Sequence, residues 1–215
     1  MPTPRTTLQR HPERGSHDRA LVDAVLDEGL VAHVGFSDGG QAFVIPMSYA
    51  RIGDRLYLHG SVASRALGAL RGGAPACVTV TLLDGLVLAR SAFRHSVNYR
   101  SAVILGVARE VVDEAEKRRA LAAIVDHAVP GRSATVRGPN DAELRSTAVV
   151  WLPLDEASAK VRTGPPMDLD QDLAQPCWAG ELPLALVPGA PRADPRLAPG
   201  VAAPEAVARY RRGRR

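Results

Sequence analysis

The stretch FVIPMSYARIGDRLYLHGSVASRAL, residues 43–67, holds the signals that decide the predicted fold. A strand is predicted over residues 41–50, and a second strand follows over residues 56–60 after a glycine-containing turn. A short helix then fits residues 63–70, because two glycines follow its last apolar residues. Pro46 donates no ladder hydrogen bond, so it marks a sheet edge, a bulge or a position where a ligand faces the backbone.

Further elements are predicted on both sides of this stretch from apolar periodicity and turn residues. Strands are expected over residues 30–36, 76–83, 86–93, 101–111, 148–154 and 158–164, with an Asp84-Gly85 hairpin turn between the second and third. One helix should be capped by Ser16 and end at Gly29. Another should begin at Asp113 in a capping-box pattern with Glu116, and should bury Leu121, Ile124, Val125 and Ala128. We therefore expect an α+β protein, mainly β, on a six-stranded antiparallel barrel with added helices.

The length of 215 residues suits one domain with extensions. We expect an N-terminal extension over residues 1–15, the folded domain over 16–165, a proline-rich extension over 166–208 that packs on the barrel or on a partner subunit, and a basic disordered tail over 209–215. The excess positive charge lies mainly at the chain ends, so nucleic-acid binding through the arginine tail is a minor alternative. No apolar run suits a membrane span or a signal peptide, which favours a cytoplasmic protein without a membrane partner.

The cysteines and histidines form no recognisable catalytic or metal-binding constellation. Cys77 and Cys177 lie far apart without metal-ligand spacing, so neither a disulfide nor a zinc site is expected. His33, His59 and His95 lie in or beside predicted strands, but no two have the close spacing of metal ligands. No Ser–His–Asp spacing supports hydrolysis, and no catalytic residue is assigned.

The segment HGSVASRA, residues 59–66, is a candidate phosphate-binding turn. The chain leaves a strand there, passes Gly60 and Ser61, and starts a helix near Ser64 and Arg65. Backbone N–H groups, two hydroxyls and a guanidinium would converge, which is what a phosphate monoester needs. The alternative is that Ser61 only caps the helix and Arg65 is a solvated surface residue. The segment matches neither a P-loop nor a dinucleotide fingerprint.

A second polar group lies in RHSVNYRSAV, residues 94–103. Asn98, Tyr99, Arg100 and Ser101 precede an apolar run and offer several hydrogen-bond donors and one aromatic ring. These groups could bind the carbonyls and nitrogens of a heteroaromatic ring. The alternative is an ordinary polar loop.

Three stretches together carry a family resemblance. FVIPMSYARIGDRLYLHGSVASRAL, VTVTLLDGLVLARSAFRHSVNYRSAVILG and EASAKVRTGPP resemble the flavin-binding split-barrel proteins related to pyridoxamine 5′-phosphate oxidase, in the branch that includes nitroimidazole-resistance reductases. The resemblance covers about residues 14–178. It implies a split β-barrel homodimer that binds FMN between its two subunits.

The resemblance also implies which residues contact the cofactor. The strand residues Val44, Ile45, Pro46, Met47, Ser48 and Tyr49 would pass the isoalloxazine and ribityl chain, and His59, Gly60, Ser61, Ser64 and Arg65 would hold the phosphate. Ala66 stands where the oxidases have a lysine, so one phosphate cation is missing. Arg100 and Ser101 match an Arg-Gln pair of the oxidases, and ring contacts would come from Asn98 or Tyr99. The oxidases' Arg-x-His signature is absent, which argues against oxidation of pyridoxamine phosphate.

From these features we expect an FMN-dependent oxidoreductase that transfers hydride at flavin N5 to a small nitro- or heteroaromatic acceptor. One alternative is a flavin-binding protein without turnover. Another is haem or deazaflavin binding, which the wider superfamily accommodates. Haem would require an axial ligand such as His33, His59 or His95.

Overall fold

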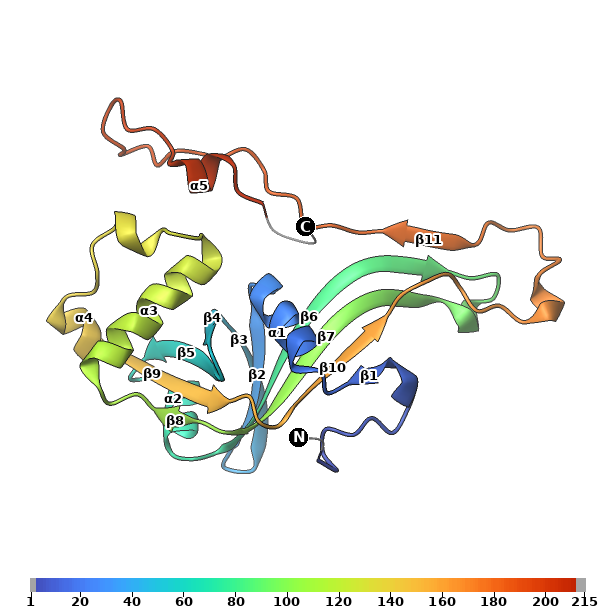
Figure 1. The fold of residues 1–215 in the computed structure, drawn as a ribbon, viewed down its shortest axis with the longest axis horizontal. Helices are drawn as coiled ribbons and strands as arrows, with labels where there is room; N and C mark the ends of the chain where they lie inside the picture. The colour runs from blue at the N-terminus through green and yellow to red at the C-terminus, as the bar shows by residue number, and fades with distance from the viewer. Residues whose placement is uncertain (1–2, 212–215) are drawn as a thin grey trace.

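Two antiparallel sheets form the body of the protein in the computed structural model, which describes residues 3–211 (Figure 1). Sheet A has the order β1 (Gly15–Ser16), β10 (Ala157–Arg162), β7 (Ser96–Val107), β6 (Pro75–Leu88), β2 (Ala32–Asp38) and β3 (Gln41–Met47), with β11 (Gly180–Pro183) also pairing with β6. Sheet B has the order β4 (Tyr49–Ile52), β5 (Arg55–Ser61), β9 (Thr147–Pro153) and β8 (Arg109–Glu110). The sheets do not close on themselves, so the α+β split-barrel expectation is confirmed, although residues 3–211 contain more strands than the six expected.

Helices cover these sheets and their connections. The α-helices are α1 (Arg19–Glu28), α2 (Arg65–Arg71), α3 (Glu114–Ala128), α4 (Asp141–Ser146) and α5 (Glu205–Ala208), and the short 3-10 turns are η1 (Pro12–Arg14), η2 (Ala92–Arg94), η3 (Ser133–Thr135) and η4 (Asp170–Asp172). Helices α1 and α2 pack into the main core, and α3 covers the opposite face of sheet B. Among the described helices, none has the length and apolar content to span a bilayer.

The core lies between the two sheets and extends under both helical layers. Leu58 of β5 and Val150 of β9 point into the main core with Leu67 of α2. On the other face of sheet B, Tyr57 and Val149 pack in a second cluster under α3. Sheet B therefore has two buried faces, and a residue on β5 faces either α2 or α3 according to its position in the alternation.

The predicted strand over residues 41–50 is broken at Ser48, where the chain passes from sheet A to sheet B. Tyr49 follows the break and is fully buried. Its hydroxyl donates to Leu26 O at 2.6 Å and to Gly29 O at 3.1 Å, two carbonyls at the end of α1. The chain therefore changes sheets at a residue whose side chain ties the new strand to a helix.

Helix α1 begins later than predicted. Its N-cap is Asp18, whose side chain accepts a hydrogen bond from Ala20 N at 3.0 Å, while Ser16 lies in β1. Gly29 ends the helix with φ −67°, so it does not adopt the left-handed conformation that usually explains a terminal glycine. A Cβ there would lie 2.3 Å from Val80 Cγ1, so glycine is needed for close approach of the chain.

Helix α3 begins where predicted, but the set of residues that it buries differs from the prediction. Asp113 caps it by accepting from Glu116 N at 2.7 Å. Glu116 was expected to complete a capping box, but its carboxylate accepts hydrogen bonds from Arg55 and Tyr57, each at 2.7 Å. Ile124 is buried as expected, but Val125 is 39% exposed and Ala128 is exposed. The predicted apolar face is therefore only partly covered by the sheet.

The predicted Asp84-Gly85 hairpin is wrong. Strand β6 runs through both residues with only a bulge between Leu83 and Gly85, and the turn into β7 lies near η2. A Cβ on Gly85 would lie 3.0 Å from Leu182 O of β11, so the glycine allows a third strand to approach. Consequently β7 begins at Ser96, before the predicted start at residue 101.

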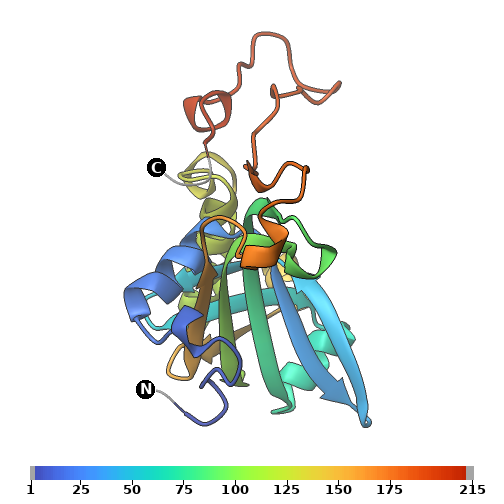
Figure 2. The ribbon, with the colours of Figure 1, turned by 90° about the vertical axis from the view of Figure 1, so that its right-hand side faces the viewer.

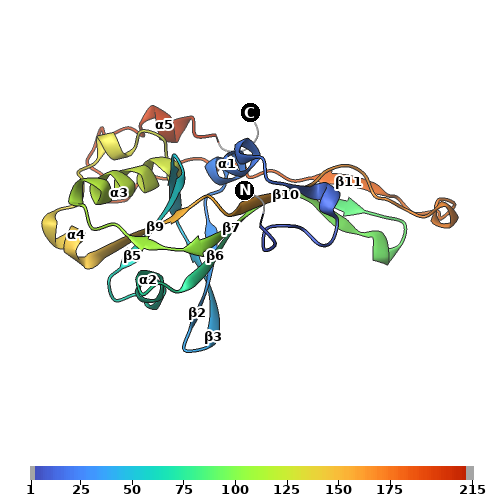
Figure 3. The same cartoon turned by 60° about the horizontal axis from the view of Figure 1, so that its bottom comes forward.

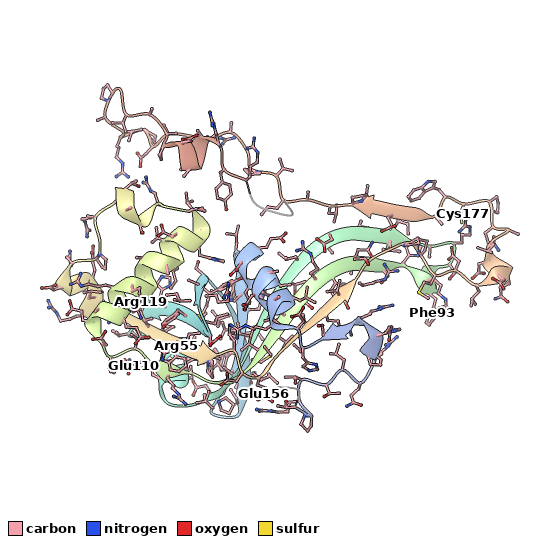
Figure 4. All side chains as sticks on the ribbon, viewed as in Figure 1. Arg55, Phe93, Glu110, Arg119, Glu156 and Cys177 are labelled. Carbon is pink, nitrogen blue, oxygen red and sulfur yellow. The ribbon has the colours of Figure 1, made fainter. Side chains whose placement is uncertain are left out.

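Strands β6 and β7 extend past the body as a long arm (Figure 1). Phe93 is 88% exposed, and Figure 4 shows Phe93 and Cys177 at the far end of this arm, away from Arg119 on α3. After β11 the chain runs back along the molecule but stands away from the body (Figures 1 and 2). None of residues 184–211 is buried. The predicted basic tail falls partly on residues 212–215, which lie outside the described part of the chain.

Candidate cofactor site

Strand β3 forms a free edge of sheet A and is open on both faces. Within residues 3–211 it pairs only with β2. Val44 is 65% exposed and Ile45 is 39% exposed, so the edge offers apolar surface together with unpaired backbone groups. Met47 packs in part against the core, and Ser48 is exposed. Of the three predicted explanations for Pro46, the structure supports a sheet edge.

The register continues this edge into an outer face of sheet A (Figure 2). Residues that lie opposite each other in an antiparallel pair share a face. On this basis the outer face of sheet A carries His33, Val44, Pro46, Thr79, Thr81, Tyr99, Ser101 and Val103. The intervening residues Val34, Val78 and Ala102 are fully buried on the inner face. The structure therefore brings four predicted site residues, Val44, Pro46, Tyr99 and Ser101, onto one surface.

Arg65 lies beside the β3 edge, next to Phe43, which pairs with the buried Phe36 and so faces the inner side of sheet A. Its guanidinium carbon is 4.8 Å from the ring centroid of Phe43 on β3, and its Nε is 3.9 Å from Asp38 Oδ2. The side chain is 63% exposed. Figure 3 shows the β2–β3 hairpin projecting from the body with α2 alongside it. One predicted cation thus lies beside the free edge with its charge accessible.

The two serines of the turn differ in their roles. Ser61 Oγ accepts from Ala63 N at 3.2 Å, whereas Ser64 is the N-cap of α2 and its hydroxyl makes no capping bond. The N-cap is therefore Ser64, and the alternative in which Ser61 only caps the helix does not hold. Gly60 faces the core, where a Cβ would lie 2.8 Å from Leu67 Cδ2 and push α2 outward. Ser61 and Arg65 remain exposed at this turn.

Two members of the second predicted group point away from the outer face of sheet A. Arg100 is 9% exposed and its guanidinium bonds both Asp84 and Glu28, with Nη2 2.8 Å from one oxygen of each. Asn98 Nδ2 lies 2.5 Å from Glu181 Oε2 of β11 and also donates to Gly164 O. These side chains connect β7 to neighbouring elements. The polar segment is thus part of a strand, and its alternation divides its four polar residues between two faces.

The side chain of Tyr49 also lies away from the outer face, because its hydroxyl is held at the end of α1. Its ring centroid is 4.7 Å from that of His127, whose Nε2 is 2.6 Å from Gly29 O. Tyr49 therefore has a structural role in the fold.

His59 lies apart from the other predicted phosphate residues. It pairs with Val149, which packs under α3, so its side chain is on the α3 face of sheet B while Arg65 lies beside β3. Its Nδ1 is buried and has no hydrogen-bond partner. Burial lowers the pKa of the imidazole, which keeps it neutral at pH 7. The structure does not bring His59 and Arg65 together.

A pocket opens beside His59, with a volume of about 470 Å³. Helix α3 forms one wall through Leu121 and Val125, and residues 133–139 form the other through Val136. Arg118 and Arg137 also line it, and they are 39% and 70% exposed in their side chains. Sequence reasoning missed this pocket because it placed Val125 in the core. The only signal available in the sequence was the histidine at the end of a strand.

Among the described residues, no group of three or more His, Cys, Asp or Glu side chains could hold a metal ion. Both cysteines are free. A metal held in a porphyrin ring needs only one or two protein ligands, so this finding does not bear on haem.

A comparison with protein-family models shows the family to which the chain belongs. A family model described as pyridoxamine 5′-phosphate oxidase matches residues 18–161. The chain belongs to the pyridoxamine 5′-phosphate oxidase family. The match spans both sheets and most of the elements that form the β3 edge and the His59 pocket. No curated protein matches the chain in a sequence comparison.

Two solved structures are similar to this oxidase-family chain over most of its length, and a third over about two thirds of it. The flavocytochrome Anf3 from Azotobacter vinelandii is 43% identical, with a TM-score of 0.92 and 98% of each chain covered. A FAD and haem binding protein from Mycobacterium smegmatis is 40% identical, with a TM-score of 0.86, and the match covers 90% of this chain and 95% of that one. A structure named for 5-nitroimidazole antibiotic resistance, from Bacteroides thetaiotaomicron, is 26% identical with a TM-score of 0.58, covering 68% and 86%.

Proposed function

We propose that this protein is a redox protein that binds both a flavin and a haem. The observation that carries the proposal is the similarity to two proteins named for that pair of cofactors, which covers 98% of this chain for the first and 90% for the second. Bound flavin would supply hydride chemistry and bound haem one-electron chemistry. The chain's own part is to position the two groups and to exclude water.

The β3 edge supports the flavin half of the proposal. The strand offers unpaired backbone donors and acceptors, and Val44 and Pro46 supply apolar surface for one side of a planar ring. Arg65 lies beside the same strand, next to Phe43 on its inner side, with an accessible guanidinium, which suits a flavin phosphate at this edge. FMN and FAD both contain the flavin ring and a phosphate, so these contacts suit either cofactor. The similarity to a FAD and haem binding protein favours FAD over the FMN expected from the sequence.

His59 supports the haem half. A buried imidazole nitrogen without a hydrogen-bond partner, beside an apolar pocket, fits the donor chemistry that haem iron requires. A deazaflavin would make no use of such a ligand.

We further propose that the protein acts as a homodimer with the flavin at the subunit interface. The outer face of sheet A and residues 184–211 both expose apolar side chains, including Val44, Leu186 and Val187. A second copy of the chain would cover them and would complete the enclosure of a ring lying on β3.

Replacing Arg65 with Ala tests the flavin site. The variant should weaken flavin binding by about 1.5–3 kcal/mol, because a charge-assisted hydrogen bond to phosphate is lost. Titration of the flavin-free full-length protein with FAD and with FMN, followed by fluorescence quenching, measures the change. Arg71→Ala is the matched control, since Arg71 lies at the other end of α2 and pairs with Glu110 at 2.8 Å. Equal affinities of both variants and the wild type would remove Arg65 from the site.

A parallel titration of the full-length protein with haem separates the proposal from its rivals. A protein that binds flavin and takes up no haem would instead favour the flavin-dependent reductase of small nitro- or heteroaromatic compounds. Oxidation of reduced nicotinamide with such an acceptor then distinguishes a reductase from a flavin-storage protein.

A further inference from the structure

The chain presents two separate candidate surfaces for two cofactors. The outer face of sheet A and the adjoining β3 edge, beside which Arg65 lies, have the features expected of a flavin site. The His59 pocket lies on the α3 face of sheet B, with the sheet between it and α2. The inference that follows concerns the ligand of the His59 pocket, and it rests on the proposed function.

Among the six histidines, His59 is the one whose surroundings suit an axial ligand. His11, His17, His95 and His127 each have a ring nitrogen within hydrogen-bond distance of an oxygen. His33 is exposed on the outer face of sheet A and lines no described pocket. His59 combines a buried nitrogen that lacks a partner with a position on the pocket wall.

The pocket walls suit an apolar plate with acidic substituents. The carbon side chains of Leu121, Val125 and Val136 form the lining, and their exposure leaves apolar surface that an occupant would cover. Arg118 and Arg137 also line it, with Arg118 donating to Pro139 O at 2.7 Å and to Glu114 Oε1 at 2.9 Å. Arg137 pairs with Glu143 at 2.6 Å, and both side chains are substantially exposed. Such surface pairs contribute little stability, so Arg137 can exchange its partner for a ligand carboxylate at low cost.

We infer that this pocket binds haem, with His59 as an axial ligand of the iron and with Arg118 and Arg137 facing the propionates. The low basicity of the buried imidazole agrees with this role, because only the neutral ring coordinates iron.

Titration of full-length protein with ferric haem b, followed through the Soret band and by electron paramagnetic resonance, tests the inference. Changes in outer-sphere partners alone cost about 10- to 100-fold in metal affinity, so His59→Gly should weaken haem binding by at least about 100-fold. Added imidazole should restore the wild-type spectrum in His59→Gly, because the free ring can enter the space left by the side chain. His33→Ala and His95→Ala are the controls and should leave affinity and spectrum unchanged.

A second variant tests the pocket itself. Val125→Trp would place a large side chain in the pocket from a position that is already 39% exposed, so the fold should tolerate it. It should lower haem affinity by about tenfold or more, while FAD affinity stays at the wild-type value. Equal flavin binding also verifies that each variant is folded.

The outcomes distinguish this inference from the proposed function. If the wild type binds flavin and no haem, the haem half of the proposed function is wrong, and the inference is wrong with it. If the wild type binds haem and His59→Gly keeps the same affinity and spectrum, the proposed function stands and the inference alone is overturned. Loss of binding in His33→Ala rather than in His59→Gly would move the site to the outer face of sheet A.

Discussion

Arginine side chains have two distinct roles in this protein, and burial separates them. Arg65 is 63% exposed beside the free β3 edge, with only a distant carboxylate and an aromatic ring as neighbours. Arg100 is nearly buried, and the hydrogen bonds that it donates to Glu28 and Asp84 raise the pKa of its guanidinium. The first has a charge that a ligand can reach. The second has its charge balanced inside the protein.

Arg100→Ala should therefore reduce stability more than flavin affinity. Removing Arg100 takes the shared cation from its ion pairs with Glu28 and Asp84, so the free energy of unfolding should fall by about 3 kcal/mol. Urea unfolding of the flavin-free protein measures this change. Arg196→Ala is the control, because its pair with Asp194 is 90% and 53% exposed, and the loss should stay within about 0.5 kcal/mol. Unchanged stability in Arg100→Ala together with lost flavin binding would return Arg100 to the cofactor site.

The sequence predicted which polar residues exist near the site but could not predict their partners. Asn98 and Arg100 look like ligand-binding donors in the segment HSVNYRS. Their carboxylate partners include Glu28, which is 72 residues away from Arg100, and Glu181, which is 83 residues away from Asn98. Only the folded chain brings these groups together. The alternation of β7 then decides that Tyr99 and Ser101 face outward.

At the scale of elements, glycines show where local patterns and tertiary contacts disagree. Asp84-Gly85 has the composition of a hairpin turn, yet Gly85 sits in a continuous strand because β11 approaches it. The β11 segment lies almost 100 residues later in the chain, within a region whose proline content predicted irregular structure. Strands with strong alternation were predicted well, since burial of one face is a local property.

Gly29→Ala should destabilise the protein. The new methyl group would lie 2.3 Å from Val80 Cγ1 and 2.8 Å from Tyr49 Oη, so a cost of about 1–3 kcal/mol is expected from overpacking. Thermal unfolding measures the change. Gly68→Ala is a matched control in α2, where nothing lies within 4 Å of the new Cβ, and it should stabilise by about 0.5–1 kcal/mol. Two changes of the same sign would contradict the close-approach explanation.

At the scale of the whole molecule, the C-terminal segment is the part that an isolated subunit does not explain. Residues 184–211 stand away from the body and none is buried (Figure 1). Leu184, Leu186 and Val187 are exposed there, although apolar side chains usually find cover. A partner subunit supplies that cover in the proposed dimer. The proline content of the sequence predicted this extension. Within it, β11 contacts the barrel by pairing with β6.

Ending the chain after Pro183 tests the dimer. The shortened protein should lose most of its tendency to associate, because apolar contacts across the interface are removed. Light scattering coupled to size-exclusion chromatography should give twice the chain mass for the full-length protein and a lower average mass for the truncated one. Removal of residues 209–215 alone should leave the dimer intact. A truncated protein that stays fully dimeric would assign the interface to the outer face of sheet A without the C-terminal segment.

The most direct test of the central claim is the absorbance spectrum of the purified full-length protein, prepared with flavin and haem available. We predict flavin bands and a Soret band together, with one flavin and one haem per chain after extraction and quantification. A flavin spectrum without a Soret band, even after added haem, would contradict the two-cofactor assignment, and a colourless protein that rejects both groups would contradict the account as a whole.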